Sequence, residues 1–175
     1  MILIIDLAYS PDSLCRSEFC MPFREVLAGT HASRIVHRSN LAEKDLDESS
    51  AAILSGTPLK DRGYLDELES EFGWIKEYGK PILGVCAGMQ VLSLIYGGRL
   101  VECTEIGMTD AETMLENPLF SGVFRAYSLH TMAAETTFDF EVLARSKKCV
   151  QAIRHASHPY YGVLFHPEVR NTDVI

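Results

Sequence analysis

The amino-acid sequence predicts an α/β fold, in which a mostly parallel sheet is covered by helices and extended by a few antiparallel strands. The first observation is a series of short, continuous apolar runs bounded by turn residues, which is typical of strands buried on both faces. These runs are residues 1–6, 34–36, 51–54, 81–85 and 161–165. The second observation is that stretches with helical apolar spacing lie between the early runs. Strands that alternate with helices form parallel sheets, and ligands then bind beyond the carboxyl ends of the strands.

Two helices are indicated by apolar residues three and four positions apart, which share one face of a helix. Residues 64–78 contain Leu65, Leu68, Phe72 and Ile75 at this spacing, and residues 87–96 contain Met89, Leu92 and Ile95. The later segments near residues 98–103, 122–127, 138–145 and 149–154 follow one another as short strands. We expect them to form an antiparallel addition or the edge of the sheet. Residues 11–22 are expected to be a loop.

Length and composition indicate one globular domain. The chain has 175 residues, which is enough for one sizeable core and too few for two ordinary domains, so we expect a single domain at residues 1–175. Hydrophobic residues make up 47% and charged residues 23%, a balance that argues against disorder. The net charge of −8 repels phosphate backbones, so we expect no nucleic-acid partner.

Targeting signals and metal motifs are not indicated. The apolar start has no basic segment or cleavage site, and charges interrupt every apolar run before the roughly 20 residues that cross a bilayer. We therefore expect a cytoplasmic protein without membrane contact. Five cysteines without a CxxC pair indicate neither a disulfide framework nor a zinc knuckle, so we expect a reducing compartment, no metal and no cofactor. Four of the cysteines are expected to be buried, inert thiols: Cys15, Cys20, Cys103 and Cys149.

The strongest chemical signal is a glycine-flanked cysteine between an expected strand and an expected helix. Within residues 80–90, Gly84 lies two positions before Cys86 and Gly88 two positions after it. This is the pattern of a nucleophile elbow, a strained turn that needs small neighbours because a Cβ would collide with nearby backbone. The free N–H groups at the start of the helix would favour a thiolate at Cys86.

A base and an orienting carboxylate follow the last apolar run. Cleaving an amide requires a proton for the departing nitrogen, which an imidazole near the thiolate can provide. His166 follows the apolar run, and Pro167 biases it toward extended backbone, in which residues two apart face the same side. Glu168 can thus contact His166, fix its tautomer and stabilise the imidazolium. Cys86, His166 and Glu168 are the candidate catalytic residues.

Each of these three residues also has a non-catalytic interpretation. Cys86 alone could be a core thiol, His166 a surface residue at a strand end, and Glu168 a solvated charge. Their joint occurrence favours a catalytic site. The histidines that lack the strand-end context are expected at the surface: His31, His37, His155 and His158.

The motifs resemble those of the triad, or class-I, glutamine amidotransferases. The resemblance covers nearly the whole chain and rests on residues 53–58, 84–90, 141–146 and 166–168. Within that family, the glutaminase portion of GMP synthetase is most similar, through residues 88–90, 118–122 and 161–169. The resemblance implies a flavodoxin-like, mostly parallel sheet with helices on both faces. It also implies a glutaminase that uses a Cys-His-Glu triad.

The resemblance further implies a role for each matching residue. Cys86 would form a γ-glutamyl thioester that water then hydrolyses, and the backbone N–H groups of Ala87 and Thr57 would hold the oxyanion. The glutamine-binding residues would be Gly56, Gln90, Leu129 and His130. For Gln90 the alternative is a polar residue on the exposed face of its helix, and for His130 it is an ordinary loop histidine.

Three features depart from the family pattern. The oxyanion loop usually carries glycine where this chain has Thr57, and a Cβ there restricts the backbone. Residues 129–132 read Leu-His-Thr-Met where GMP synthetases typically read Ser-His-Gly-Asp, so an acidic residue near the partner interface is missing. Residues 8–22 do not match the usual short loop after the first strand. An acceptor enzyme other than GMP synthetase is therefore an open alternative.

The sequence also indicates that a second protein completes the reaction. It has no phosphate-binding GxxxxGK[ST] loop, so the acceptor chemistry must take place elsewhere. Because free ammonia would be protonated and lost, we expect a partner synthetase that receives it, and the candidate is the ATP-dependent subunit of GMP synthetase. Docking often completes such sites, so we expect low activity in isolation. A stand-alone γ-glutamyl hydrolase or peptidase and a catalytically silent regulatory module are the other two hypotheses.

Overall fold

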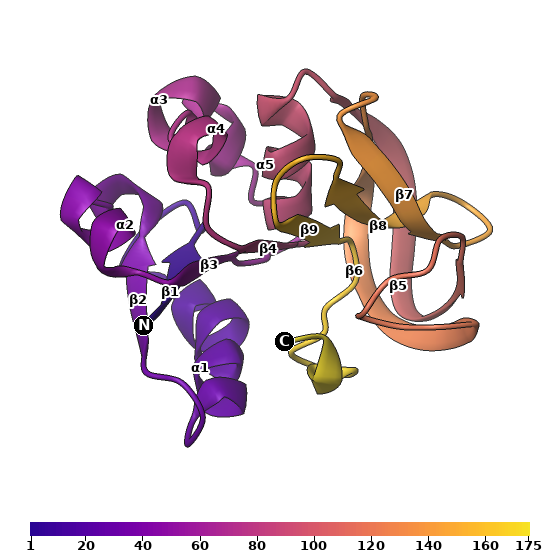
Figure 1. Ribbon diagram of the computed structural model, residues 1–175, viewed down its shortest axis with the longest axis horizontal. Coiled ribbons are helices and arrows are strands. Elements are labelled where there is room, and N and C mark those ends of the chain that lie inside the picture. The colour runs from indigo at the N-terminus through magenta and orange to yellow at the C-terminus, as the bar shows by residue number, and fades with distance from the viewer.

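A computed structural model describes residues 1–175 and contains one nine-stranded sheet (Figure 1). The strands lie in the order β2-β1-β3-β4-β9-β8-β7-β5-β6. The first five are parallel to one another, and all later pairings are antiparallel. The strands are β1 (Ile2–Asp6), β2 (Ser33–His37), β3 (Ala51–Leu54), β4 (Ile82–Val85), β5 (Arg99–Thr113), β6 (Val123–Glu135), β7 (Phe140–Arg145), β8 (Val150–His155) and β9 (Tyr160–Val163). The predicted α/β class and its antiparallel addition are confirmed.

Helices cover both faces of the parallel part of the sheet (Figure 1). The α-helices are α1 (Met21–Leu27), α2 (Glu43–Glu48), α3 (Leu68–Phe72), α4 (Ile75–Tyr78) and α5 (Ala87–Ile95). Alternate residues of β1 face opposite sides, so Leu3 and Ile5 share a core with Met89 of α5, whereas Ile4 shares the other core with Phe23 of α1. The sheet therefore separates two hydrophobic cores. Packing against both cores holds the strands, and so the loops at their ends, in place.

Two expected elements are wrong in detail. Residues 11–22, expected as a loop, contain the helical turn η1 (Arg16–Cys20) and the first residues of α1. Pro22 lies in the first turn of α1, where its missing N–H costs no hydrogen bond. The helix expected over residues 64–78 is divided into η3 (Gly63–Leu65), α3 and α4, with Gly73 directly after α3. The remaining short turns are η2 (Arg38–Asn40) and η4 (Thr172–Val174).

The strands expected near residues 98–103 and 122–127 belong to a much longer hairpin. Strand β5 has 15 residues and β6 has 13, and the pair forms one side of the molecule in Figure 1. A β-bulge interrupts their register between Glu102 and Glu105. Bulges re-aim the side chains beside them, and this one lies close to His130 on the partner strand.

Two histidines are not at the surface as expected. His37 is buried at the end of β2, where its Nε2 donates to the Ala8 carbonyl at 2.8 Å. His155 is buried among aromatic rings, and burial lowers its pKa. His31 is exposed and His158 is partly buried. No helix has the length and apolar character needed to span a membrane.

Candidate active site

Cys86 occupies the sharp turn between β4 and α5. Its φ of 50° and ψ of −102° lie in a region that residues with a side chain rarely adopt, as expected of a nucleophile elbow. A Cβ added to Gly84 would lie 2.6 Å from the Gly88 backbone, and one added to Gly88 would lie 2.4 Å from the Leu54 carbonyl oxygen. Both glycines are therefore required by close backbone contacts, and the predicted reason for the motif is confirmed.

His166 and Glu168 form a buried pair beyond the end of β9. His166 Nδ1 and Glu168 Oε1 are 2.7 Å apart, and both side chains are almost fully buried. The backbone turns at residues 167–169, with the Val169 N–H donating to the His166 carbonyl, so a turn rather than extended backbone brings the two side chains together. The carboxylate therefore accepts a hydrogen bond from the Nδ1 N–H and fixes the orientation of the ring.

The charge of His166 depends on its neighbours. Burial acts to lower its pKa, but the Cys86 side chain and then Glu168 raise it, to about 10. These two neighbours favour the imidazolium form of the ring. An imidazolium beside Cys86 would stabilise a thiolate, which is the reactive form of cysteine.

Two further residues position His166. The sequence gives no role to the first, Phe19, and predicts the second, Gly56, only as a glutamine-binding residue. Phe19 of η1 packs against the imidazole, with ring centroids 5.8 Å apart. Gly56 approaches from the loop after β3, where a Cβ would lie 2.6 Å from His166 Cε1. Phe19 lies in the segment expected as a loop, so the sequence carried no signal for this contact.

The space beside Cys86 is small. It measures about 20 Å³, room for roughly one water molecule and far too little for glutamine. Its walls include most of the residues predicted to bind substrate or the oxyanion, namely Thr57, Ala87, Gln90, Leu129 and His130. The Thr57 N–H makes no hydrogen bond within the chain, and Ala87 lies in the first helical turn, where N–H groups are free. The predicted pocket residues lie together, but the space between them is too small for glutamine.

A short chain of hydrogen bonds joins three residues that line the pocket. The Tyr64 hydroxyl donates to Gln90 Oε1, and Gln90 Nε2 donates to the Met132 carbonyl at 3.0 Å. Gln90 is therefore buried, and the alternative of an exposed polar residue is wrong. The contacts link η3, α5 and β6 along the wall of the pocket. The sequence pattern predicts Tyr64 only as part of a helix.

His130 is a strand residue and not a loop histidine. It lies on β6, is 2% exposed, and donates from Nδ1 to the Cys103 carbonyl at 3.0 Å. The preceding residue, Leu129, accepts a hydrogen bond from the Cys86 thiol at a sulfur-to-oxygen distance of 3.7 Å. One stretch of β6 thus forms the wall opposite the nucleophile.

Comparison with known proteins agrees with this arrangement. The family described as glutamine amidotransferase class-I matches residues 23–174. The chain belongs to the class-I glutamine amidotransferases. Enzymes of this family hydrolyse the amide of glutamine, so membership supports hydrolase activity for this chain.

The relatives of this amidotransferase include subunits of GMP synthases. One subunit of the glutamine-hydrolyzing GMP synthase of Methanocaldococcus jannaschii is 41% identical over 167 residues, which cover 82% of this chain and 87% of that protein. The corresponding subunit from Pyrococcus abyssi is 31% identical over 153 residues, covering 83% and 80%. A solved structure from Thermoplasma acidophilum, described as a GMP synthase subunit, has 26% identity and a TM-score of 0.81, covering 99% of this chain and 90% of that one.

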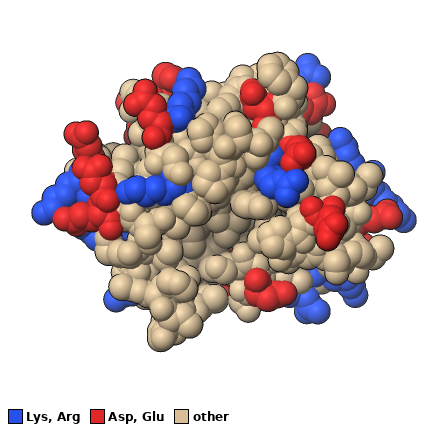
Figure 2. Space-filling view, viewed as in Figure 1, with Lys and Arg blue, Asp and Glu red and all other residues tan.

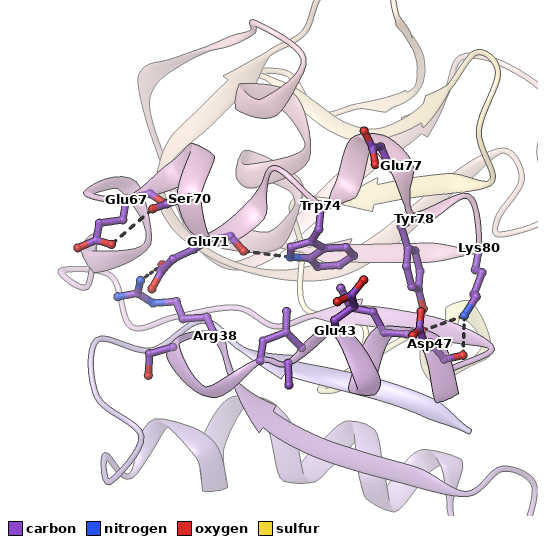
Figure 3. Close-up of a pocket in the computed structure, with 14 residues that line it drawn as sticks. Arg38, Glu43, Asp47, Glu67, Ser70, Glu71, Trp74, Glu77, Tyr78 and Lys80 are labelled. Carbon is purple, nitrogen blue, oxygen red and sulfur yellow. Dashed lines mark hydrogen bonds and ion pairs between the residues drawn. The ribbon is translucent and has the colours of Figure 1, made fainter.

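The largest groove of this amidotransferase lies away from Cys86. It has a volume of about 750 Å³ and runs between α2 and the α3–α4 segment (Figure 3). Its two basic side chains are already engaged: Arg38 contacts Glu71, and Lys80 Nζ donates to the carbonyls of Leu46, Asp47 and Ser49. On the face shown in Figure 2, acidic and basic side chains are interspersed around an uncharged centre. Neither feature competes with Cys86 as the candidate active site.

Proposed function

We propose that this chain is the glutaminase subunit of a GMP synthetase and that it supplies ammonia to a separate ATP-dependent synthetase subunit. The observation that carries the proposal is a cysteine on a strained elbow beside a His-Glu pair, in a chain 41% identical to one subunit of a glutamine-hydrolyzing GMP synthase. We assign Cys86 as the nucleophile, His166 as the acid and base, and Glu168 as the group that orients His166. Residues 1–175 are proposed to form one domain.

In the first half of the proposed reaction, the Cys86 thiolate attacks the side-chain amide carbon of glutamine. The carbonyl electrons move to oxygen, and the N–H groups of Thr57 and Ala87 hydrogen-bond to the resulting oxyanion. As the oxyanion collapses, the carbon–nitrogen bond breaks and the His166 imidazolium gives its proton to the departing nitrogen. The products are ammonia and a γ-glutamyl thioester on Cys86.

In the second half, water releases the acyl group. His166, now neutral, takes a proton from the attacking water, and the carbon–sulfur bond breaks to give glutamate and the Cys86 thiolate. Glu168 keeps the Nδ1 proton in place throughout, so that Nε2 is the atom that exchanges protons. Gly56, Gln90, Leu129 and His130 are proposed to hold the glutamine, as in similar enzymes of the family.

The closed pocket supports a requirement for a partner. A cavity of about 20 Å³ cannot hold glutamine, so its lining has to rearrange before substrate binds, and we propose that the contact between Tyr64 and Gln90 breaks in that step. A glutaminase that opens only when docked would avoid releasing ammonia into water. The five free cysteines support a reducing compartment, and on that ground we propose that the enzyme acts in the cytoplasm.

Covalent labelling tests this proposal. The purified chain is treated with a glutamine-analogue electrophile such as diazo-oxo-norleucine, with and without the cognate ATP-dependent subunit, and the adduct is located by peptide mass spectrometry. We expect slow labelling of Cys86 in the free chain, faster labelling in the complex, and protection by glutamine. Cys86→Ala should not be labelled at this site, and Cys15→Ala, which changes another buried thiol, should be labelled normally.

Two measurements separate the other two hypotheses from this one: hydrolysis of γ-glutamyl peptides and labelling of Cys86. Hydrolysis of γ-glutamyl peptides at full rate without a partner would indicate a stand-alone hydrolase. Failure of Cys86 to react in either the free chain or the complex would refute the glutaminase assignment and leave a regulatory module.

A further inference from the structure

A buried cluster of metal-binding side chains lies on the far side of the β6 wall from Cys86. Cys103 and Glu105 come from β5 at the bulge, and Cys149 directly precedes β8. Their ligand atoms all lie within 4.8 Å of one another. Cys149 and Glu105 are buried, and Cys103 is partly buried. The proposed glutaminase reaction uses none of these three residues.

A fourth side chain points into the cluster without a hydrogen bond. His130 pairs with Glu105 across the β5–β6 hairpin, and its Nε2 lies 3.3 Å from Glu105 Oε2. Because the Cys103 carbonyl can only accept, the ring proton of His130 is on Nδ1. In the neutral ring, Nε2 therefore presents a lone pair to a carboxylate oxygen, and it has no hydrogen-bond partner. Two buried acceptors that face each other need a proton or a cation between them.

The neighbours of the cluster are a neutral amide and one lysine at its edge. Gln151 Nε2 donates to Glu105 Oε2 at 2.6 Å and orients the carboxylate. The exposed Lys148 donates from Nζ to the Thr104 carbonyl at 2.9 Å. The cluster itself holds two thiols, a carboxylate and an imidazole.

We propose that Cys103, Glu105 and Cys149 bind a zinc ion, with His130 Nε2 as the fourth ligand. Two sulfurs, one carboxylate oxygen and one imidazole nitrogen are a ligand set that suits zinc better than hard cations. Zinc would displace the thiol protons and neutralise most of the charge that burial disfavours. A backbone carbonyl that accepts from Nδ1 is the usual support of a histidine that ligates through Nε2.

The distances are compatible with a tetrahedral site. With bonds of about 2.0–2.3 Å, the ligand atoms of a tetrahedral zinc lie about 3.3–3.8 Å apart. Glu105 Oε2 lies 3.4 Å from Cys149 Sγ and 3.3 Å from His130 Nε2, so two edges already have this length. The widest separation among Cys103, Glu105 and Cys149 has to close by at most about 1 Å. His130 lies more than 4.8 Å from at least one of the two sulfurs, so its ring has to move further toward the metal than the other three ligands.

A zinc ion at this place would connect to the glutamine pocket through His130. The same residue lines the space beside Cys86, and its neighbour Leu129 contacts the Cys86 thiol. Binding would fix β5, β6 and the start of β8 to one another and hold the pocket wall in place. The site was invisible in the sequence because its ligands come from three separate segments without CxxC spacing.

Cobalt substitution tests the proposal without using glutaminase activity. The titration uses the full chain carrying Cys86→Ala, so that the Cys86–His166 pair cannot bind metal, in the presence of a phosphine reductant. We expect one Co²⁺ per chain, with thiolate-to-cobalt charge-transfer absorption that Zn²⁺ removes. Cys103→Ser and Cys149→Ser should each lose at least about tenfold in affinity together with absorption, and Glu105→Gln should weaken binding but keep the absorption. Cys15→Ala is the matched control and should bind as the parent does.

Zinc-edge X-ray absorption of the parent protein gives a second measurement that does not depend on whether the variants fold. We expect two sulfur neighbours at about 2.3 Å. A first shell without sulfur, no charge transfer in the parent, or unchanged binding in the Cys103 and Cys149 variants would overturn the zinc site. Any of these results would leave the proposed role of Cys86 intact, because labelling at Cys86 measures that role separately.

Discussion

Tyr64→Phe should open the glutamine pocket of the free chain. The Tyr64 hydroxyl donates to Gln90 Oε1 in the wall of a space that holds roughly one water molecule. In an open pocket both groups would contact water, so the substitution removes stabilisation from the closed state alone. We expect this one hydrogen bond to be the main barrier to glutamine binding.

The size of the effect follows from the burial of that hydrogen bond. A buried hydrogen bond contributes about 0.5–1.5 kcal/mol, and leaving Gln90 Oε1 without a partner raises the total cost to about 1–3 kcal/mol. This range corresponds to a roughly 5- to 150-fold rise in the ratio of open to closed pocket. Labelling of Cys86 by diazo-oxo-norleucine, at a concentration well below saturation, should accelerate by the same factor until the pocket is open most of the time.

The matched control is Tyr96→Phe, because the Tyr96 hydroxyl is buried but has no hydrogen-bond partner. It should leave the labelling rate unchanged. Circular dichroism confirms that both variants are folded under the assay conditions. Equal or slower labelling of Tyr64→Phe relative to the parent would refute the reasoning, since it would mean that Tyr64 does not hold the pocket shut.

Three further predictions concern the elbow, the His166–Glu168 pair and the domain. The pKa of His166 is raised from 6.5 to about 10, so its contribution to the free energy of unfolding is complete below about pH 6.5 and is lost as the pH rises through 10. Glu168→Gln removes one of the groups that raise this pKa. The melting temperature of the variant should therefore begin to fall at a lower pH than that of the parent. Gly88→Ala places a Cβ 2.4 Å from the Leu54 carbonyl oxygen and should lower the free energy of unfolding by about 1–3 kcal/mol in urea. If residues 1–175 are one domain, urea unfolding followed by Trp74 fluorescence and by far-UV circular dichroism should give coincident curves, and separate transitions would contradict it.

The parts of the site that the sequence predicted are those set by local geometry. The elbow is specified by the spacing of Gly84, Cys86 and Gly88. Each glycine is required because a Cβ would collide with nearby backbone, that of Gly88 in the case of Gly84 and that of Leu54 on β3 in the case of Gly88. The His166–Glu168 contact is also local, although a turn and not an extended segment produces it. The alternation of apolar runs with helical spacing was enough to predict the parallel sheet.

The parts that the sequence did not predict depend on distant contacts. Tyr64 and Gln90 are 26 positions apart and Gln90 and Met132 are 42 apart, so the closed state of the pocket has no local pattern. His37 and His155 carry no apolar signature, yet both are buried because they find partners across the fold. Phe19 contacts His166 only because η1 folds over the end of the sheet.

These distant contacts also indicate where a partner has to act. Of the three groups that close the pocket, Gln90 lies on a buried helix and Met132 on a sheet strand, whereas Tyr64 lies in the η3 turn after a loop whose residues Lys60 and Arg62 are exposed. That loop is held from the other side, because the Tyr9 N–H donates to Asp61 at 2.8 Å.

Tyr9 and Leu14 are 66% and 79% exposed, in the segment that departs from the family pattern. If docking opens the pocket, the least costly motion is therefore a shift of the 57–64 loop, since Tyr64 is the one residue of this loop that belongs to either core. A synthetase subunit that covers the apolar side chains of Tyr9 and Leu14 would reach this loop directly.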